Sequence, residues 1–306
     1  MSYHIIHILN HASRVSVDRG CLVCHIPEKS PRRVPLEDIL AVIVASKGVS
    51  FSGDCLSALL IHNSIVLHCD HNYKPIGKTV GLHRVVHNEI LDQQIFQDIP
   101  FMKKVWDKIL LAKISNQAYL LNYIGAKHKL WEYIRSGNLD EGNAARHYWK
   151  IYFKNFGRSC PCSRTTRGAQ DPVNGMLNYG YAVISSLCHR LLLAHGFNTS
   201  VGIYHKYRFR SDPLVYDIME PLRTFCDFML LRFRQTNLRK KIDEWVKFAA
   251  KDIVFSKINI DEAKSLSFNL AIDKYITSFS NCFRTKTLDN LYIPSLKEIT
   301  FDYEKE

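Results

Sequence analysis

Three segments of this chain carry carboxylate or imidazole side chains in settings that suit metal chemistry. In the first, residues 140–149, Glu141 precedes Ala144 and Ala145 by one helical turn. Small neighbours on one helix face allow another helix or a substrate to approach a carboxylate closely. The competing interpretation is an ordinary first-turn glutamate that interacts with the helix dipole, and these ten residues alone favour it.

The other two segments lie further along the chain. His205 follows Gly202 by three residues, and Asp217 and Glu220 stand three residues apart in a stretch that is otherwise largely apolar. Two acids are costly to bury without a partner, so they need a metal, an arginine or water. A salt bridge to Arg223 or to another basic residue is the structural alternative.

One imidazole with two or three carboxylates is a set of ligands rich in oxygen. This set suits Mn²⁺ or Mg²⁺ with open water positions better than a closed zinc site. Among basic residues, such an ion would serve phosphodiester chemistry by polarising a phosphoryl oxygen and orienting a hydroxyl. Spacing alone does not bring Glu141 to His205, because 64 residues separate them.

The charge of the chain indicates a polyanionic partner. It has 41 Lys and Arg against 29 Asp and Glu, a net charge of +12, which attracts nucleic acid or an anionic membrane surface. Residues 146–241 alone hold 16 basic and 5 acidic residues. A solvated basic surface is the simpler interpretation, but this concentration favours contact with a phosphate backbone.

Length and cysteines bound the class of protein. The 306 residues suffice for one large domain or two modest ones. No stretch reaches the roughly 20 apolar residues of a membrane span, and the N-terminus does not resemble a signal peptide, so we expect a cytoplasmic protein with reduced cysteines. The pairs Cys21/Cys24 and Cys160/Cys162 are poorly spaced for zinc, and we predict free thiols.

Hydrophobic patterns divide the chain. Residues 1–80 read as short strands with one helix near residues 52–60. Pro75, Gly77 and Gly81 resemble a connection, and we assign residues 81–90 to a linker. From residue 91 to 306 the period is helical, with segments at 101–124, 127–136, 141–154, 174–195, 214–230, 242–250 and 261–282, and residues 155–171 form a loop. The predicted fold is α+β: a small β-rich domain followed by a larger all-α catalytic domain.

Four ordered motifs resemble a known family. The segments read E-x-x-A-A-R-x-Y-W at 141–149, D-x-x-N-x-x-L-N-Y-G-Y at 171–181, G-x-x-H at 202–205 and D-x-x-E-P-x-R at 217–223. Together they are similar to the CRISPR-associated adaptation integrases, the Cas-one family, along essentially the whole chain. The overall sequence pattern resembles the type II branch of this family.

This resemblance implies the site and the reaction. Glu141, His205 and Glu220 are then the Mg²⁺ or Mn²⁺ ligands and the catalytic residues, with Asp217 as an accessory. It further implies an N-terminal domain that forms a homodimer, and a heterohexamer with a Cas-two partner. The implied reaction inserts prespacer DNA into a CRISPR repeat by attack of a 3′-hydroxyl on a phosphodiester.

Basic and aromatic residues around these motifs are the predicted DNA contacts. Arginines would bind strand phosphates and tyrosines would stack on splayed bases; core tyrosines and solvated arginines are the alternative. Arg158 belongs to the predicted loop 155–171, which also holds the candidates Arg164 and Arg167. The candidates are Arg146, Lys150, Arg164, Arg167, Tyr179, Tyr204, Lys206, Arg208, Arg223, Arg232 and Arg234.

Two other functions compete with the integrase. One is a stand-alone metal-dependent nuclease for branched or single-stranded DNA that uses the same residues. The other is a non-catalytic scaffold that binds DNA and proteins, which the clustered ligand candidates argue against because a binder does not need them.

Overall fold

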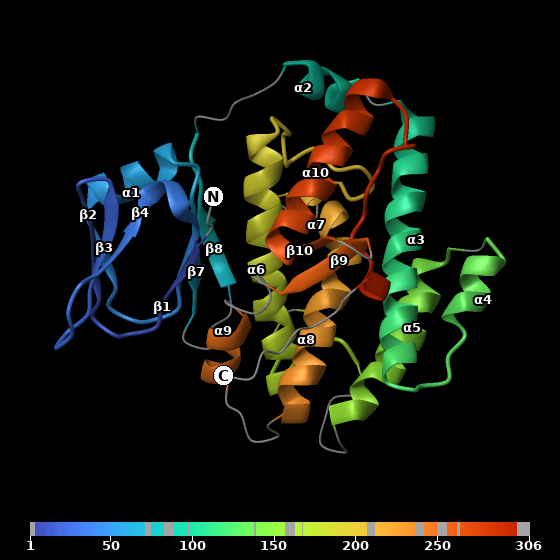
Figure 1. The fold of residues 1–306 in the computed structure, drawn as a ribbon, viewed down its shortest axis with the longest axis horizontal. Helices are drawn as coiled ribbons and strands as arrows, with labels where there is room; N and C mark the ends of the chain where they lie inside the picture. Colours follow the sequence, from blue (N-terminus) through green and yellow to red (C-terminus); the bar gives the residue numbers. More distant parts are fainter. Residues whose placement is uncertain are drawn as a thin grey trace. The chain divides into compact units, whose positions relative to one another are not determined.

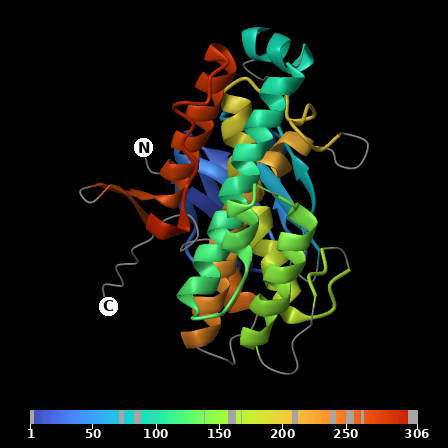
Figure 2. The same ribbon diagram turned by 90° about the vertical axis from the view of Figure 1, so that its right-hand side faces the viewer.

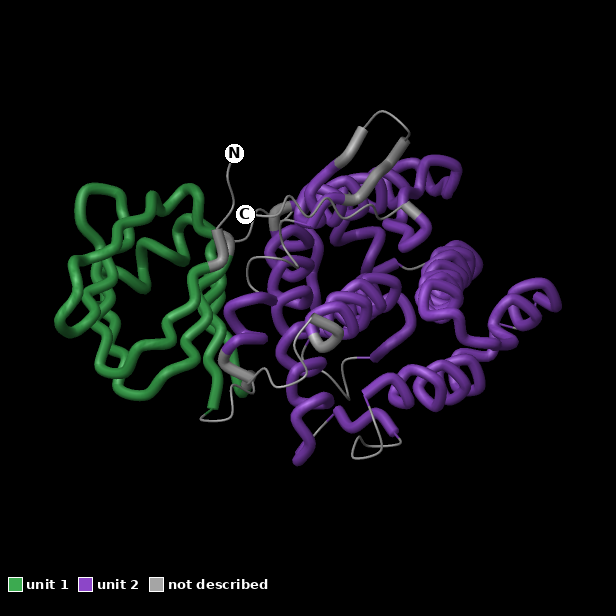
Figure 3. The backbone as a smooth tube through the Cα atoms, turned by 60° about the horizontal axis from the view of Figure 1, so that its bottom comes forward, with its two compact units in different colours: residues 1–85 green, residues 86–306 purple. Residues whose placement is uncertain are grey.

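The chain divides into two compact units, residues 1–85 and 86–306 (Figure 3). The division falls inside the segment 81–90 that the sequence assigns to a linker. The computed structural model describes residues 4–70, 75–82, 88–96, 98–137, 139–156, 163–166, 168–206, 212–236, 242–249, 256–261 and 264–298.

The first unit is β-rich, as predicted (Figure 1). One sheet has the order β1-β5-β7-β8, and the other has the order β4-β3-β2-β6. The strands are β1 His4–Ile8, β2 Arg14–Asp18, β3 Cys21–His25, β4 Arg32–Pro35, β5 Ile39–Val44, β6 Ser50–Phe51, β7 Ile65–Cys69 and β8 Pro75–Thr79. The continuous apolar run of β5 is explained by its parallel pairing with β1 on one side and β7 on the other, which places it inside a sheet.

Helix α1, Gly53–Ile61, packs on this core. Ser52 caps the helix by accepting a hydrogen bond from the Cys55 N–H at 3.2 Å. Cys55 and Leu59 are buried with strand residues such as Val42 and Val66. The apolar face of the helix therefore closes the core of the first unit.

The connection expected around Pro75 and Gly77 is wrong in part. These residues belong to β8, which pairs antiparallel with β7. β8 lies at the edge of its sheet, and Pro75 is its first residue, a position where a missing N–H is tolerated.

The second unit is mainly helical, as predicted. Its helices are α2 Asn88–Ile95, α3 Ile99–Tyr123, α4 Leu130–Arg135, α5 Glu141–Tyr152, α6 Pro172–Ala194, α7 Pro213–Met219, α8 Arg223–Thr236, α9 Ile242–Phe248 and α10 Phe268–Thr285. Helix α6 contacts α7, α8, α9 and α10, and Figure 1 shows it beside them. None of the helices in the described part of the chain is long and apolar enough to cross a membrane.

The prediction of an all-α second domain is wrong in one place. Strands β9, Lys257–Asp261, and β10, Lys264–Ser267, form an antiparallel hairpin where the helix 261–282 was expected to begin. The sequence of β9 alternates apolar and polar residues, the period of a strand. The helix itself begins only at Phe268.

Helix α3 extends along the second unit (Figure 2). Its side chains bind segments that are distant in the sequence. Asp98 caps it by accepting from the Phe101 N–H at 3.1 Å. The Asn116 amide donates to the carbonyl of Pro221 at 2.8 Å and to that of Pro294 at 3.1 Å. Its oxygen accepts from the N–H of Leu296 at 2.9 Å. A single buried side chain thus fixes the 3-10 turn η4, Glu220–Leu222, and a later segment of the chain.

Candidate active site

Glu141 and Glu220 meet around one lysine. Lys113 Nζ lies 2.7 Å from Glu141 Oε1 and 2.7 Å from Glu220 Oε2. The three residues come from α5, η4 and α3, so the fold joins positions that are 107 residues or fewer apart along the chain. Two of the three predicted ligands are therefore brought together.

The start of α5 places Glu141. Asp140 is the N-cap, and its carboxylate accepts from the Asn143 N–H at 2.9 Å. Glu141 consequently lies in the first turn, with Ala144 buried on the same helix and its own side chain 33% exposed. The carboxylate of Glu141 is therefore partly open to solvent.

Glu220 is far more enclosed, with a side chain that is 6% exposed. Its second oxygen, Oε1, accepts from Arg223 Nη2 at 3.1 Å. Burial alone raises the pKa of this carboxyl, but the charges of Arg223 and Lys113 outweigh burial and lower the pKa to about 2. Glu220 is therefore ionised at neutral pH and already has two cationic partners.

Lys113 is charged for the same reason. Burial alone lowers the pKa of its ammonium, but Glu220 and Glu141 raise the pKa above its ordinary value. The buried centre thus holds two carboxylates, an ammonium and a guanidinium, whose formal charges cancel.

Asp217, the predicted accessory residue, lies under the backbone of residues 203–205 and is bonded to His205. Its Oδ2 accepts from the N–H groups of Ile203 at 2.7 Å and Tyr204 at 2.9 Å. Its Oδ1 accepts from the Nδ1 of His205 at 2.5 Å. Asp217 is completely buried, and these bonds use both of its oxygens. The imidazole is held through Nδ1, an arrangement that directs Nε2 outward as in many metal-binding histidines.

Gly202 is required by this arrangement. A Cβ at this position would collide with the carbonyl oxygen of His205 and would lie 2.9 Å from Asp217 Oδ2 and 2.9 Å from Pro213 Cβ. The spacing of Gly202 and His205 thus reflects a backbone that wraps tightly around a buried carboxylate.

His205 stands beside Glu220. Its positive charge, when present, contributes to lowering the pKa of that carboxyl. Its ring packs edge-on against Trp106, 5.9 Å between centroids, and Trp106 in turn stacks on Tyr204 at 4.4 Å with an interplanar angle of 3°. Aromatic packing and the bond from Asp217 together restrict the imidazole.

These residues fit a divalent ion chemically. Two carboxylates and one imidazole are suitable donors for Mg²⁺ or Mn²⁺. In the described part of the chain, no three His, Cys, Asp or Glu side chains already surround one point as a metal site. Between the two glutamates stands the ammonium of Lys113.

The predicted DNA contacts fall into three groups. Arg146, Lys150 and Lys206 are exposed, and Tyr204 is 57% exposed. Arg164, Arg223 and Arg232 are partly or fully enclosed. Arg158, Arg167, Arg208 and the side chain of Arg234 lie outside the described residues.

Tyr179 and Arg223 differ from the prediction. Tyr179 is 2% exposed, so its ring belongs to the core and is not available for stacking on a base. Arg223 is paired with Glu220 and lies over the ring of Tyr181 at 5.0 Å. Burial stabilises the large ring of Tyr179, whereas the ion pair with Glu220 offsets the cost of burying the Arg223 guanidinium.

Arg164 and Arg232 also have protein partners. Arg164 donates to the side-chain oxygens of Asn174 at 2.9 Å and Asn178 at 2.6 Å, and it lies over the Tyr181 ring. Arg232 lies over the ring of Phe228 at 5.9 Å. Arg164 therefore fastens the loop to α6, whereas the exposed candidates have room for DNA.

The sequence analysis missed a further buried carboxylate, Asp227, which is 1% exposed. The hydroxyls of Tyr148 and Tyr181 donate to its two oxygens at 2.7 and 2.5 Å, and the Tyr152 hydroxyl donates to its carbonyl at 2.9 Å. Burial raises the pKa of Asp227 to about 6, and the tyrosine hydrogen bonds only partly oppose this. The tyrosines at 148 and 181 were visible as motif positions, but nothing in the sequence paired them with Asp227.

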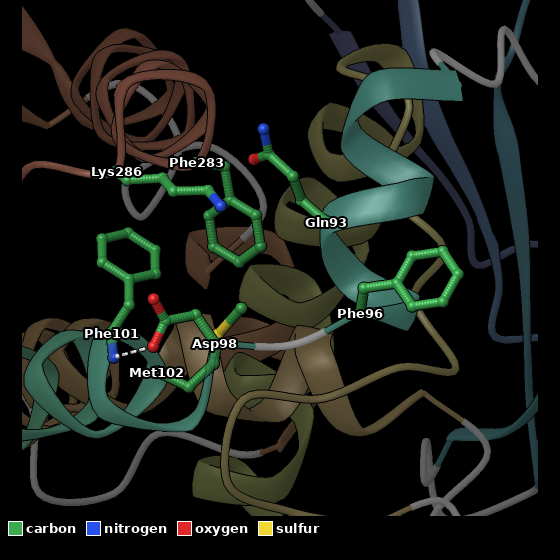
Figure 4. Close-up of a pocket in the computed structure, with 7 residues that line it drawn as sticks. All are labelled: Gln93, Phe96, Asp98, Phe101, Met102, Phe283 and Lys286. Carbon is green, nitrogen blue, oxygen red and sulfur yellow. Dashed lines mark hydrogen bonds between the residues drawn. The ribbon is translucent and has the colours of Figure 1, made fainter.

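A shallow hollow lies elsewhere in the second unit (Figure 4). Among the described residues that line it, Asp98 and Lys286 are charged, and Asp98 is engaged in capping α3. None of the predicted site residues that the structure describes is among them. Its lining is Gln93, Phe96, Asp98, Phe101, Met102, Phe283 and Lys286.

Comparison with known proteins identifies the family of this chain. The family model of CRISPR associated protein Cas1 matches residues 6–140 and 138–245. A β-rich unit followed by a helical unit is the fold of this class of CRISPR-associated protein. The chain belongs to the Cas1 family.

Similar proteins extend over most of the chain. The CRISPR-associated endonuclease Cas1 of Neisseria meningitidis serogroup C (strain 8013) is 29% identical over 309 residues, 97% of this chain and 98% of the relative. CRISPR-associated endonuclease Cas1 1 of Francisella tularensis subsp. novicida (strain U112) is 28% identical over 77% of this chain and 80% of its own length. Both of these relatives are named CRISPR-associated endonucleases.

Solved structures share the fold. A casposase bound to integration product has a TM-score of 0.79 at 17% identity, covering 100% of this chain and 96% of that chain. A CAS1 protein from Thermotoga maritima has a TM-score of 0.78 at 13% identity, covering 92% and 97%. A Cas6-RT-Cas1--Cas2 complex has a TM-score of 0.79 at 18% identity, covering 97% of this chain and 36% of that chain.

Proposed function

We propose that this protein is a divalent-metal-dependent DNA integrase and endonuclease that inserts prespacer DNA into a CRISPR repeat. The observation that carries the proposal is the convergence of Glu141 and Glu220 on one point, with His205 held beside Glu220 by Asp217. Membership of a family whose relatives are named endonucleases supports it. So does the likeness in fold to a casposase solved with its integration product.

Glu141, Glu220 and His205 would hold Mg²⁺ or Mn²⁺. When bound, the ion supplies Lewis-acid polarisation of a phosphoryl oxygen. The reaction is a transesterification. The 3′-hydroxyl oxygen of the prespacer forms a bond to phosphorus as the bond to the 3′-oxygen of the repeat strand breaks. The attacking hydroxyl loses a proton and the leaving oxygen gains one, so no further reactant is consumed.

The chain's own residues bind and orient the strands in this proposal. Arg146, Lys150 and Lys206 are exposed cations that would contact phosphates. Tyr204, stacked on Trp106 and next to His205, offers its ring to an unpaired base. Asp217 fixes the imidazole, because a carboxylate on Nδ1 sets both its tautomer and its orientation.

The proposal includes two kinds of protein partner. The first unit would form a homodimer, and two dimers would join a Cas-two dimer in a heterohexamer. A Cas1--Cas2 complex among the structures of similar fold supports this choice of partner.

An integration assay tests the function. The protein is incubated with a Cas-two partner, a prespacer duplex and a plasmid carrying the repeat, with Mg²⁺ or Mn²⁺ and in parallel with excess EDTA. We expect covalently joined product only with the ion present. Joined product in EDTA would refute metal dependence.

A stand-alone nuclease is the second candidate, since the relatives are named endonucleases. The same assay distinguishes it. Cleavage of branched or single-stranded DNA without any joined product, under conditions where the ion is bound, would favour the nuclease over the integrase.

A further inference from the structure

Lys113 forms two ion pairs at the place where a divalent ion would bind. Its ammonium contacts one oxygen of Glu141 and one oxygen of Glu220, both at 2.7 Å. An ammonium donates three hydrogen bonds and accepts none. Lys113 therefore occupies lone pairs of the same carboxylates that the ion needs.

The charges at this point balance before any ion arrives. Glu141 and Glu220 contribute two negative charges, and Lys113 and Arg223 contribute two positive charges. An added divalent ion would leave two positive charges in excess within a largely buried centre, where like charges repel strongly. One of the two cations has to withdraw.

The contacts identify which cation withdraws. Arg223 binds Glu220 alone, through Oε1, and its guanidinium also lies over the Tyr181 ring. Lys113 binds both glutamates and stands between them. Its ammonium ends a flexible four-carbon stem, so it can move by rotation of the side chain. The backbone of α3 need not move, because Asn116 in the next turn fastens it to Pro221 and Pro294.

We propose that Lys113 is a positioning residue that holds Glu141 and Glu220 together in the metal-free enzyme and releases at least one of them when a divalent ion binds. The inference rests on the metal-dependent function proposed above. Lys113 keeps the two carboxylates assembled in advance, and its competition weakens binding of the ion.

Mn²⁺ titration of three proteins tests this, with free Mn²⁺ followed by electron paramagnetic resonance. Lys113→Met removes the ammonium while keeping a stem of similar length. Lys108→Met is the matched control, because Lys108 is an exposed lysine on the same helix. We expect Lys113→Met to bind Mn²⁺ at least about tenfold more tightly than wild type. The Mn²⁺ affinity of Lys108→Met should equal that of wild type.

Thermal unfolding gives the second signature. Without the ion, Lys113→Met should melt below wild type, since two carboxylates then face each other without their shared partner. Mn²⁺ should raise its Tm by more than it raises that of wild type. Equal or weaker Mn²⁺ binding by Lys113→Met would overturn the inference, whereas failure of wild type itself to bind Mn²⁺ would refute the proposed function.

Wild-type protein alone provides a further test that does not depend on the folding of a variant. Crystal structures of the full chain with and without Mn²⁺ should differ at Lys113, with its ammonium beyond hydrogen-bond distance of Glu141 or Glu220 when the ion is bound. Persistence of both contacts beside a bound ion would overturn the inference.

Discussion

Two buried carboxylates of the second unit have opposite surroundings. Asp227 is held by the neutral hydroxyls of Tyr148 and Tyr181, and burial raises its pKa to about 6. Glu220 is held by the cations Lys113 and Arg223, which lower its pKa to about 2 despite burial. The surroundings of Asp227 favour its protonated form, whereas the two cations beside Glu220 favour its ionised form.

The difference distinguishes a structural centre from the candidate functional one. The donors around Asp227 are themselves rigid, buried rings that connect α5 and α6 to α8. Of the two cations around Glu220, Lys113 also pairs with Glu141, whose side chain is one-third exposed and open to exchange of partners. The closed network, Asp227 with Tyr148 and Tyr181, joins α5 and α6 to α8. The open set, Glu141, Glu220, Lys113 and Arg223, is the candidate for chemistry.

The largest expected effect is the loss of activity when Glu141, a member of the open set, is changed. Glu141→Gln removes one negative charge but leaves Lys113 paired with Glu220, so the fold should persist. We expect the rate of strand joining to fall by at least about 100-fold, measured with labelled prespacer. Glu132→Gln, an exposed glutamate on α4, is the control and should retain wild-type activity. A wild-type rate for Glu141→Gln would remove Glu141 from the site.

Asp217→Asn should have the next largest effect. The amide nitrogen cannot accept the hydrogen bonds that Asp217 receives from the backbone and from His205. We expect a loss of about 10- to 100-fold in metal affinity or activity, smaller than for Glu141→Gln. Asp107→Asn, at an exposed position of α3, is the control. A loss equal to that of Glu141→Gln would favour a direct ligand role for Asp217.

Tyr148→Phe tests the closed network. The change deletes one hydroxyl donor to Asp227 without adding volume. Leaving this buried carboxylate short of a donor should lower the free energy of unfolding by about 1–3 kcal/mol, measured by urea denaturation. Tyr123→Phe, at a 57% exposed position, is the control. Unchanged stability of Tyr148→Phe would show that the network contributes little to holding α5 against α8.

The smallest predicted effect is a dependence on pH. The folded pKa of Asp227 is raised, so the folded state binds this proton more tightly than the unfolded state. Its contribution to the free energy of unfolding is present below the unfolded pKa and is lost as pH rises through about 6. Asp227→Asn removes this contribution, so its cost in stability should be about 1 kcal/mol greater at pH 5 than at pH 7. An equal cost at both pH values would contradict the raised pKa.

Much of the local structure could be predicted from the sequence. Periodicity is a property of neighbouring residues, so α3, α5 and α6 were expected close to their observed bounds. The hairpin of β9 and β10 was missed because its strands are short and β10 lies within the segment 261–282 that was predicted to be helical.

The candidate site was predicted in its parts but not in its contacts. Motif spacing indicated Glu141, His205 and Glu220 as residues of interest. The pairing of both glutamates with Lys113 joins three separate elements, which no local pattern encodes. Likewise, the position of Asp217 under the backbone of residues 203–205 depends on how the chain folds back on α7.

The hydrogen bonds of Asn116 have a consequence for the order in which the candidate site can form during synthesis. The turn that contains Glu220 is tied through Pro221 to an amide that also binds the backbone of Pro294 and Leu296. On a ribosome, residues 294 and 296 emerge well after all the predicted ligands have been synthesised. The turn that carries Glu220 therefore acquires all of these contacts with Asn116 only after residue 296 has been synthesised, 76 residues after Glu220.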